Sequence, residues 1–584
     1  MTPARAGAFL LGAALMIAEV ALLRALSFAA WYHFAFLVTG IAMLGGSFAG
    51  AWRSVRPTPW PRSACVAALL LALVVVLLHT LSFGGGAHPW LARAAIVLAI
   101  GAAAFALSLG LADALLAEDA ARVYAADLAG AAGGAVAALA LLPIAGAHGT
   151  LWIAAVLAAS AAVLGWRGRR ALPVLIALVL ATATPLARAS LSPRVAANKS
   201  IGREATDDLL ARRTLFSAED AVARIDVVTT AEGARILIDG GSAMSRVPAN
   251  PERPPADALF PELWERARGQ RVLVIGSGGG FEVALALQYG AAHVVAVELS
   301  GATLDYVRHH AGAGLRAMFA DPRVTVVHDE ARSFLERHAD RFGLIVAAHT
   351  IANAAATSAL FLTEDMLLTR EAIATLLAHL DEQGVLYVSR PAVQIATLHA
   401  LVASVTAGAR SWRWPSGDGF FAAVVVDRRG TLAPARAEEG VAAPSVTLPS
   451  DDRPYFHAFA TRASVREALV AGAQVGGAQA TRRALEELPL GWAAAWASAI
   501  AAFLCLALLG WRARARPPAI GAAICTGIGF LLIELPAIAR MTVLVGAPSR
   551  GFAAVVAGML IGAAVVSARR QRPHALRPFL FACA

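Results

Sequence analysis

Long apolar runs occupy both ends of this chain and leave a more polar middle. Runs of about 20 apolar residues, the length that crosses a bilayer as a helix, recur before residue 188 and again after residue 488. Their ranges are 6–28, 31–52, 63–83, 89–116, 124–145, 149–166 and 171–187, and then 489–511, 517–539 and 551–568. These runs predict an N-terminal transmembrane bundle at 1–187 and a C-terminal transmembrane section at 489–584.

The middle of the chain, 188–488, has the periodicity of a soluble α/β domain. Alternating apolar residues at 223–228 and 234–238 predict a hairpin within a β region at about 200–250. Strand patterns follow at 271–275, 293–297, 324–328, 343–348, 384–389 and 420–426, with helical patterns between them, notably at 362–380 and 394–408. This alternation predicts a mostly parallel, doubly wound sheet over about 262–430, Rossmann-like and of the S-adenosylmethionine-methyltransferase type.

Composition supports the same division. Of the 584 residues, 58% are hydrophobic and only 15% are charged, against roughly 25% charge in a soluble domain. The net charge of +10 comes almost wholly from arginine, because Lys199 is the only lysine. The arginines cluster between apolar runs and form no basic stripe with aromatic residues, so no nucleic-acid partner is predicted. The cysteines lie in apolar context without metal-ligand spacing, so no metal site is predicted either.

A glycine-rich turn joins the strand at 271–275 to the next helical pattern. Glycines at this point let a ligand approach the backbone closely. A dinucleotide fingerprint would need a small residue at 281, where this chain has Phe281. The spacing of Gly276, Gly278 and Gly280, with Ser277 between them, fits an adenosyl mononucleoside better. A glycine turn that binds no ligand is the alternative.

Carboxylates follow the next two strands of the predicted sheet. Glu298 ends the second strand, where it can accept hydrogen bonds from both ribose hydroxyls, and Asp329 ends the third, where it can meet the adenine amino group. The alternatives are a solvated strand end for Glu298 and a helix N-cap for Asp329. The predicted adenosyl pocket consists of Gly276, Ser277, Gly278, Gly280, Glu298, Asp329 and Glu330.

The run from Ile238-Asp239-Gly240 through the glycine turn, Glu298 and Asp329 resembles the spermidine/spermine synthase (polyamine aminopropyltransferase) family. Further runs resemble its membrane-embedded branch: YAADLAG at 124–130, LTEDMLLTREA at 362–372, SDDRPYF at 450–456 and GFLLIELP at 529–536. The resemblance implies aminopropyl transfer from decarboxylated S-adenosylmethionine to an amine such as putrescine. The charged motif of Asp451, Asp452 and Arg453 has a simpler interpretation as a structural ion-pair cluster.

The chain departs from the family where the reaction needs a base. The family has two aspartates after the fourth strand, and the matching positions here are Ala348 and Ile351. The acidic residue of the family's glycine loop is replaced by Gly279. His349 is a candidate base near neutral pH. Glu282 is a candidate for binding a cationic group, or it stabilises the start of a helix.

Three functions fit these features. The first is a membrane-bound, spermidine-synthase-like transferase that moves a group from decarboxylated S-adenosylmethionine or S-adenosylmethionine, without a metal, to an amine or lipid-like acceptor. The second is an S-adenosylmethionine-dependent methyltransferase with the same pocket. The third is a non-catalytic nucleoside-binding or transporter-like protein with a degenerate synthase domain. The expected partners are the lipid bilayer and the small-molecule acceptor, with a homodimer as an option.

The ionisable residues within the apolar runs and the arginines between the runs bear on membrane placement. The ionisable residues form either interhelical ion pairs or a polar pocket for a lipid, a quinone-like molecule or a polyamine; they are Glu19, Arg24, Asp113, Asp127 and Glu534.

If all seven N-terminal runs cross a plasma membrane, the arginine clusters share one side, which the positive-inside rule makes cytoplasmic. The middle domain is then extracytoplasmic, whereas an adenosyl cofactor pool is cytosolic. One missed or extra crossing would place the domain in the cytosol.

Overall fold

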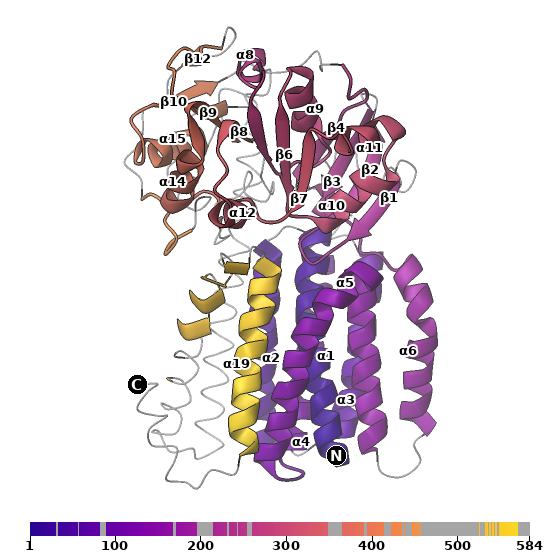
Figure 1. Cartoon of the computed structure of the whole chain (residues 1–584). Helices are drawn as coiled ribbons and strands as arrows, with labels where there is room; N and C mark the ends of the chain where they lie inside the picture. Colours follow the sequence, from indigo (N-terminus) through magenta and orange to yellow (C-terminus); the bar gives the residue numbers. More distant parts are fainter. Residues whose placement is uncertain are drawn as a thin grey trace.

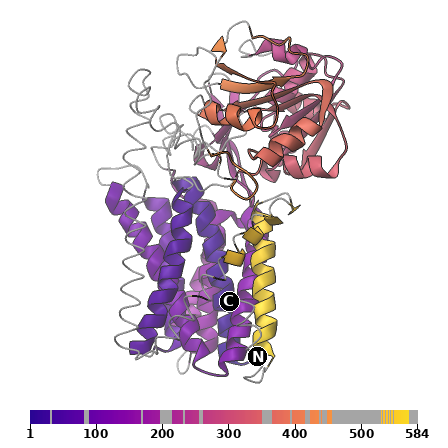
Figure 2. The same cartoon turned by 90° about the vertical axis from the view of Figure 1, so that its left-hand side faces the viewer.

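The computed structural model shows a helix bundle with an α/β domain at one end (Figure 1). The two parts stack end to end in the perpendicular view as well (Figure 2). The structure describes residues 1–30, 33–56, 58–81, 89–166, 171–195, 214–230, 233–241, 243–253, 260–348, 365–390, 394–413, 422–434, 438–439, 447–454, 456 and 548–569, with short pieces between 525 and 545.

Apolar helices form the bundle. They are α1 (Pro3–Ala29), α2 (His33–Val55), α3 (Trp60–Thr80), α4 (Pro89–Leu115), α5 (Ala120–Gly165), α6 (Ala171–Ser190) and α19 (Pro548–Ala568). Within the described residues, six helices are long and apolar enough to cross a membrane. The helix at 171–190 continues three residues past the expected boundary at 187. The run at 489–511 lies outside the described residues, as does most of 517–539.

Helix α5 contains two of the expected runs. Its 46 residues would extend about 69 Å if straight, more than twice the ~30 Å of a bilayer core. The backbone is non-helical at Gly146, with φ 67° and ψ 172°. A Cβ on Gly130 would lie 2.0 Å from the Phe9 carbonyl oxygen, while Cβ atoms on Gly165 and Gly7 would each meet the Trp60 ring. Both halves of α5 therefore reach the start of α1, so the chain turns back at Gly146.

Small residues allow α1 and α5 to pack closely. Cβ atoms on Gly130 and Gly134 would lie 2.0 Å from the Phe9 carbonyl oxygen and 2.6 Å from the Ala13 carbonyl oxygen. Such small residues four apart are typical of close helix contacts in membranes. Two of the ionisable side chains of the apolar runs are paired: Arg24 with Asp239 of the α/β domain, and Asp113 with Arg53 of α2.

A small antiparallel sheet connects the bundle to the rest of the domain. Its strands, in spatial order, are β1 (Thr214–Glu219), β2 (Arg224–Thr230), β3 (Gly233–Ile238) and β4 (Ala243–Val247). The expected hairpin is β2–β3, and the short helix η1 (Asp239–Gly241) follows it. The sequence did not predict β1 and β4, whose exposed and half-buried residues alternate without a clear apolar face.

The main sheet has eight strands in the order β12-β10-β11-β9-β8-β5-β6-β7. The strands are β5 (Arg271–Ile275), β6 (His293–Glu298), β7 (Val324–His328), β8 (Phe342–Ala347), β9 (Leu380–Arg390), β10 (Ala409–Arg413), β11 (Ala422–Asp427) and β12 (Glu438–Glu439). The five strands from β9 to β7 are parallel, but β10, β11 and β12 pair antiparallel. The sheet is Rossmann-like and mostly parallel, as expected, and its last strands make it mixed because they return as antiparallel neighbours at one edge.

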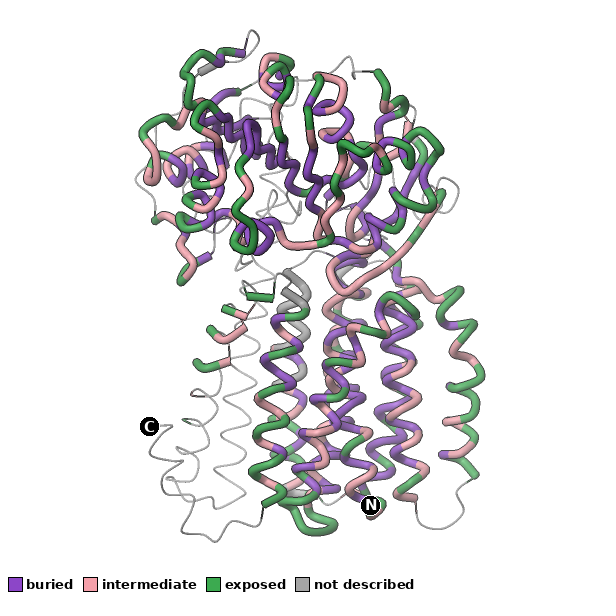
Figure 3. Tube along the Cα trace, in the orientation of Figure 1, coloured by how far each residue is buried: buried purple, intermediate pink, exposed green. Residues whose placement is uncertain are grey.

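Both faces of the central strands are buried (Figure 3). Val272 and Val274 pack toward the small sheet, and Leu273 and Ile275 pack toward the helices of the other face. This double burial explains the unbroken apolar pattern of β5. The helices are α8 (Pro261–Glu265), α9 (Phe281–Gln288), α10 (Gly301–Asp305), η2 (Tyr306–His310), α11 (Ala313–Phe319), α12 (Ala331–Arg337), α14 (Arg370–Ala378) and α15 (Ile395–Ala403). Helix α14 begins later than expected because Thr369 caps it by accepting a hydrogen bond from the Ala372 N–H.

The turn at Gly146 should accept only glycine. Its φ and ψ are open to glycine alone, so Gly146→Ala should destabilise the protein by about 1–3 kcal/mol. The measurement is the thermal unfolding temperature of the full chain in detergent. Gly133→Ala is the matched control, because a Cβ at this helical glycine meets nothing within 4 Å and should stabilise slightly. Equal effects of the two substitutions would contradict the assigned turn.

Candidate functional site

The carboxyl ends of four adjacent parallel strands meet at one edge of the main sheet. Strands β8, β5, β6 and β7 are neighbours there, and they lead into Ala348, Gly276, Glu298 and Asp329 respectively. The structure therefore brings together the glycine turn and the two anchor carboxylates expected from the sequence. His349 and Ile351 lie outside the described residues.

The backbone N–H groups of the glycine turn are used inside the protein. Gly276 and Ser277 donate to the Val297 carbonyl, Gly278 to Glu298 Oε2, Gly279 to Ser245 Oγ, and Gly280 to the Ser277 carbonyl, at 2.8–3.1 Å. A phosphate site of the dinucleotide type needs N–H groups aimed at the ligand. With each N–H from 276 to 280 already donated, the turn suits a nucleoside without a phosphate.

Strand β4 lies directly on the glycine turn. A Cβ on Gly278 would lie 2.3 Å from Ser245 Oγ, and one on Gly279 would lie 2.3 Å from the Arg246 carbonyl oxygen. Gly278 also has φ 49°, a conformation that favours glycine. An acidic side chain at 279, as in the family that the sequence resembles, would displace β4. The glycine at 279 therefore has a steric explanation in this chain.

Glu298 is held in place by two backbone donors. Ser300 N donates to Oε1 and Gly278 N to Oε2, each at 2.8 Å. Burial raises the pKa of Glu298, and the backbone N–H groups of Ser300, Gly278 and Leu299 oppose that shift. Each carboxylate oxygen retains acceptor capacity after one hydrogen bond, so both ribose hydroxyls of a nucleoside could donate to it.

Asp329 and Glu330 have different roles. Asp329 Oδ1 accepts from the Glu330 N–H and Oδ2 pairs with Arg337, while its own N–H donates to the Glu298 carbonyl at 3.1 Å. Glu330 caps α12, its Oε2 accepting from the Ser333 N–H at 2.8 Å. The helix cap considered for Asp329 is thus formed by Glu330. Asp329 remains beside Glu298, but a contact from it to adenine would compete with Arg337.

Glu282 is a half-buried carboxylate in the first turn of α9. Burial raises the pKa of Glu282 to about 7, with its own N–H and the Arg246 charge acting in the opposite direction. Burial also raises the pKa of Tyr387 of β9, and the Glu282 charge adds to that rise. A carboxylate that titrates near neutral pH beside a candidate ligand loop is typical of a functional group.

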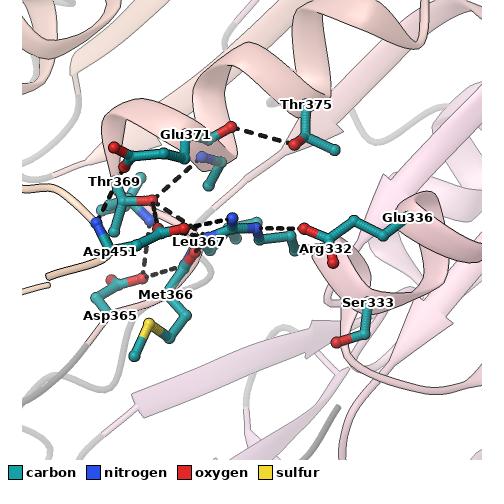
Figure 4. Close-up of polar contacts among 12 residues, drawn as sticks. Arg332, Ser333, Glu336, Asp365, Met366, Leu367, Thr369, Glu371, Thr375 and Asp451 are labelled. Carbon is teal, nitrogen blue, oxygen red and sulfur yellow. Dashed lines mark hydrogen bonds and ion pairs between the residues drawn. The ribbon is translucent and has the colours of Figure 1, made fainter. Parts of the chain in front are cut away.

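A charged cluster fixes the segment that precedes the C-terminal apolar runs (Figure 4). Arg332 of α12 donates from Nη1 and Nη2 to the two carboxylate oxygens of Asp451, at 2.7 Å each. The Thr369 hydroxyl donates to the same Asp451 at 2.7 Å, and Glu371 accepts from the Asp451 N–H at 3.0 Å. Burial would raise the pKa of Asp451, but the hydrogen bonds from Arg332 and Thr369 hold it below its usual value. The structural interpretation of this motif is confirmed for Asp451.

Comparison with known proteins gives a weak likeness. No family model matches the chain. Two similar solved structures are a spermidine synthase from Thermotoga maritima and a spermidine synthase in complex with the transition-state analogue AdoDATO. Each is 17% identical with a TM-score of 0.30, and each match covers 38% of this chain and 74% of the other chain.

The raised pKa of Glu282 predicts a pH-dependent stability. Its folded value of about 7 exceeds the ordinary 4.5, so folding favours the protonated carboxyl and the wild type loses stability as pH rises between these values. Glu282→Gln should therefore be more stable than the wild type above pH 7, by up to about 3 kcal/mol, and similar below pH 4.5.

Thermal unfolding at pH 8 and pH 4.5 measures this difference. Glu265→Gln is the matched control, because Glu265 is exposed on α8. A Glu282→Gln variant with the same stability difference at both pH values would show that Glu282 titrates normally.

Proposed function

We propose that this chain is a membrane-bound transferase whose donor is an adenosyl sulfonium compound, S-adenosylmethionine or its decarboxylated form. The observation that carries the proposal is the pairing of Glu298 with a glycine turn that has no N–H left to donate. The carboxylate suits ribose hydroxyls, and the turn does not suit a phosphate. The weak likeness of the fold to spermidine synthases is consistent with this choice but adds no weight to it.

The charges at the sheet edge also suit a cationic donor. Glu282 and Glu298 flank the glycine turn, and a sulfonium carries a positive charge. In the transfer, the acceptor nitrogen or oxygen bonds to the carbon next to sulfur, the C–S bond breaks, and its electron pair returns to sulfur to leave a neutral thioether. The acceptor must also lose a proton to a base. Glu282 is ionised above pH 7 and can take this role or bind an acceptor cation, and His349 is the other candidate.

The helix bundle supports an acceptor that comes from the membrane. The six long apolar helices support a multi-pass location in the cell membrane, so an amine with an apolar tail or another lipid-like acceptor could reach the site from the bilayer. Arg53, Arg56 and Arg62 lie at the end of the bundle away from the α/β domain, because α1 starts at that end and reaches the domain with Arg24. The positive-inside rule then favours an extracytoplasmic domain.

A comparison of binding affinities would identify the donor. Purified protein is titrated with S-adenosylmethionine, its decarboxylated form and methylthioadenosine. Preference for the decarboxylated form would indicate aminopropyl transfer, whereas preference for S-adenosylmethionine would indicate methyl transfer.

Glu298→Ala should weaken binding at least a hundredfold, because both ribose hydroxyls lose a charged acceptor. Glu382→Ala, an exposed carboxylate at the opposite end of the sheet, is the control. Absence of binding by the wild type would leave only the non-enzymatic function.

The side of the membrane is decided by cysteine labelling in intact cells. In a variant without the native cysteines, Asn250→Cys places a thiol on an exposed loop of the domain, and Ala117→Cys places one between α4 and α5 at the other end of the bundle. A membrane-impermeant maleimide should label only the cysteine at 250 if the domain is extracytoplasmic. Labelling of the cysteine at 117 alone would show the opposite orientation, with the α/β domain on the cytoplasmic side.

A further inference from the structure

The turn between β1 and β2, residues 219–224, contacts both the helix bundle and the loop that holds Glu298. Two consecutive carboxylates make these contacts. Glu219 Oε2 accepts a hydrogen bond from the Ala147 N–H of α5 at 2.9 Å. Asp220 Oδ2 accepts from the Ser300 hydroxyl at 3.0 Å and from the Ala302 N–H at 2.9 Å. One turn thus connects two parts of the chain that are far apart in sequence.

The Glu219 contact lies at the break in α5. Ala147 follows Gly146, so its N–H belongs to the start of the second half of the helix, where backbone donors lack partners within the helix. A carboxylate is favourable there because it meets the positive end of the helix dipole. A Cβ on Gly146 would lie 3.2 Å from Glu219 Oε2, so the carboxylate also fills the space beside the break.

The Asp220 contact reaches the ribose anchor. Asp220 Oδ1 closes the turn by accepting from the Val222 and Ala223 N–H groups, each at 2.7 Å. Its Oδ2 holds Ser300, and the Ser300 N–H donates to Glu298 Oε1 at 2.8 Å. Because both oxygens of Asp220 are used, a shift of the turn would move Ser300 and reorient Glu298.

The other end of the turn is fixed to the bundle side. The Arg224 guanidinium lies 4.1 Å from the centre of the Phe28 ring, and its Nη1 donates to Ser192 Oγ at 2.6 Å. Its backbone N–H donates to Asp239 Oδ1 at 3.0 Å, and Asp239 pairs with Arg24 of α1 at 2.7 Å. The turn is therefore held by α1, by the segment after α6 and by the broken helix α5.

We propose that Asp220 is a positioning residue for the donor site, and that Glu219 makes its position depend on the backbone at the break in α5. A change in the backbone at this break would then change the affinity for the donor, and donor binding would shift the equilibrium at the break by the same factor. This inference rests on the proposed function for the identity of the donor. The physical connection from Ala147 to Ser300 does not depend on it.

The test uses the full chain in lipid nanodiscs and two readouts, the affinity for methylthioadenosine and amide hydrogen exchange at Ser300 and Ala302. Asp220→Asn should weaken binding about tenfold, because one oxygen that accepts two hydrogen bonds becomes a donor. Glu219→Gln should weaken binding about threefold, because a neutral amide oxygen is a weaker acceptor than a carboxylate for the Ala147 N–H of α5. The double variant should lose no more than Asp220→Asn alone, because both residues act through one turn.

Hydrogen exchange separates this inference from the proposed function. Both single variants should exchange several-fold faster than the wild type at Ser300 and Ala302, with or without a nucleoside. Asp305→Asn, an exposed carboxylate on the same helix α10, is the control and should change neither readout. If Asp220→Asn does not fold, Ser300→Ala is used in its place, because this variant also removes the hydrogen bond between the Ser300 hydroxyl and Asp220.

The outcomes are distinct. A wild type that binds no nucleoside would refute the proposed donor, and the exchange rates would still decide the inference. Unchanged affinity and exchange in Glu219→Gln would overturn the connection to α5. Wild-type affinity and exchange in Asp220→Asn would overturn its positioning role.

Discussion

The ion pair between Arg24 at the end of α1 and Asp239 in η1 fixes the α/β domain on the helix bundle. Both side chains are largely buried, 11% and 15% exposed, and removal of one partner would leave a buried charge at a cost of roughly 3–5 kcal/mol. Asp239 has φ 45° and Gly240 has φ 64°, and a Cβ on Gly240 would lie 2.8 Å from the Phe28 carbonyl oxygen. The small sheet is thereby placed so that β4 covers the glycine turn, and the site depends on this junction.

The sequence predicted the parts of the fold that are fixed by local pattern. Strand β5 was predictable because burial on both faces leaves an unbroken apolar run, and Glu298 because it ends the next such run. Contacts between distant segments could not be read in this way. Ser245 meets Gly279 across 34 residues, and Asp220 meets Ser300 across 80 residues, from strands without a clear apolar face. The pairing of Asp329 with Arg337, at the far end of the following helix α12, was also not predicted, and the contact of Asp329 with adenine stays a prediction.

The proposed function does not need aspartates at 348 and 351, where the sequence has Ala348 and Ile351. Ala348 offers no base at the end of β8, and β4 excludes an acidic side chain at Gly279. Glu282, whose pKa burial raises to about 7, lies on the same edge of the sheet and is the base that we propose. In the proposed function, the adenosyl anchor Glu298 and the base Glu282 are therefore separate residues.

A structure of the full chain in nanodiscs with bound S-adenosylmethionine would show whether Glu298 holds the donor. We expect both ribose hydroxyls within hydrogen-bond distance of the Glu298 carboxylate, with the sulfonium between Glu298 and Glu282 at the carboxyl edge of β5 and β6. A nucleoside bound elsewhere, or one whose ribose leaves Glu298 without contact, would contradict this expectation.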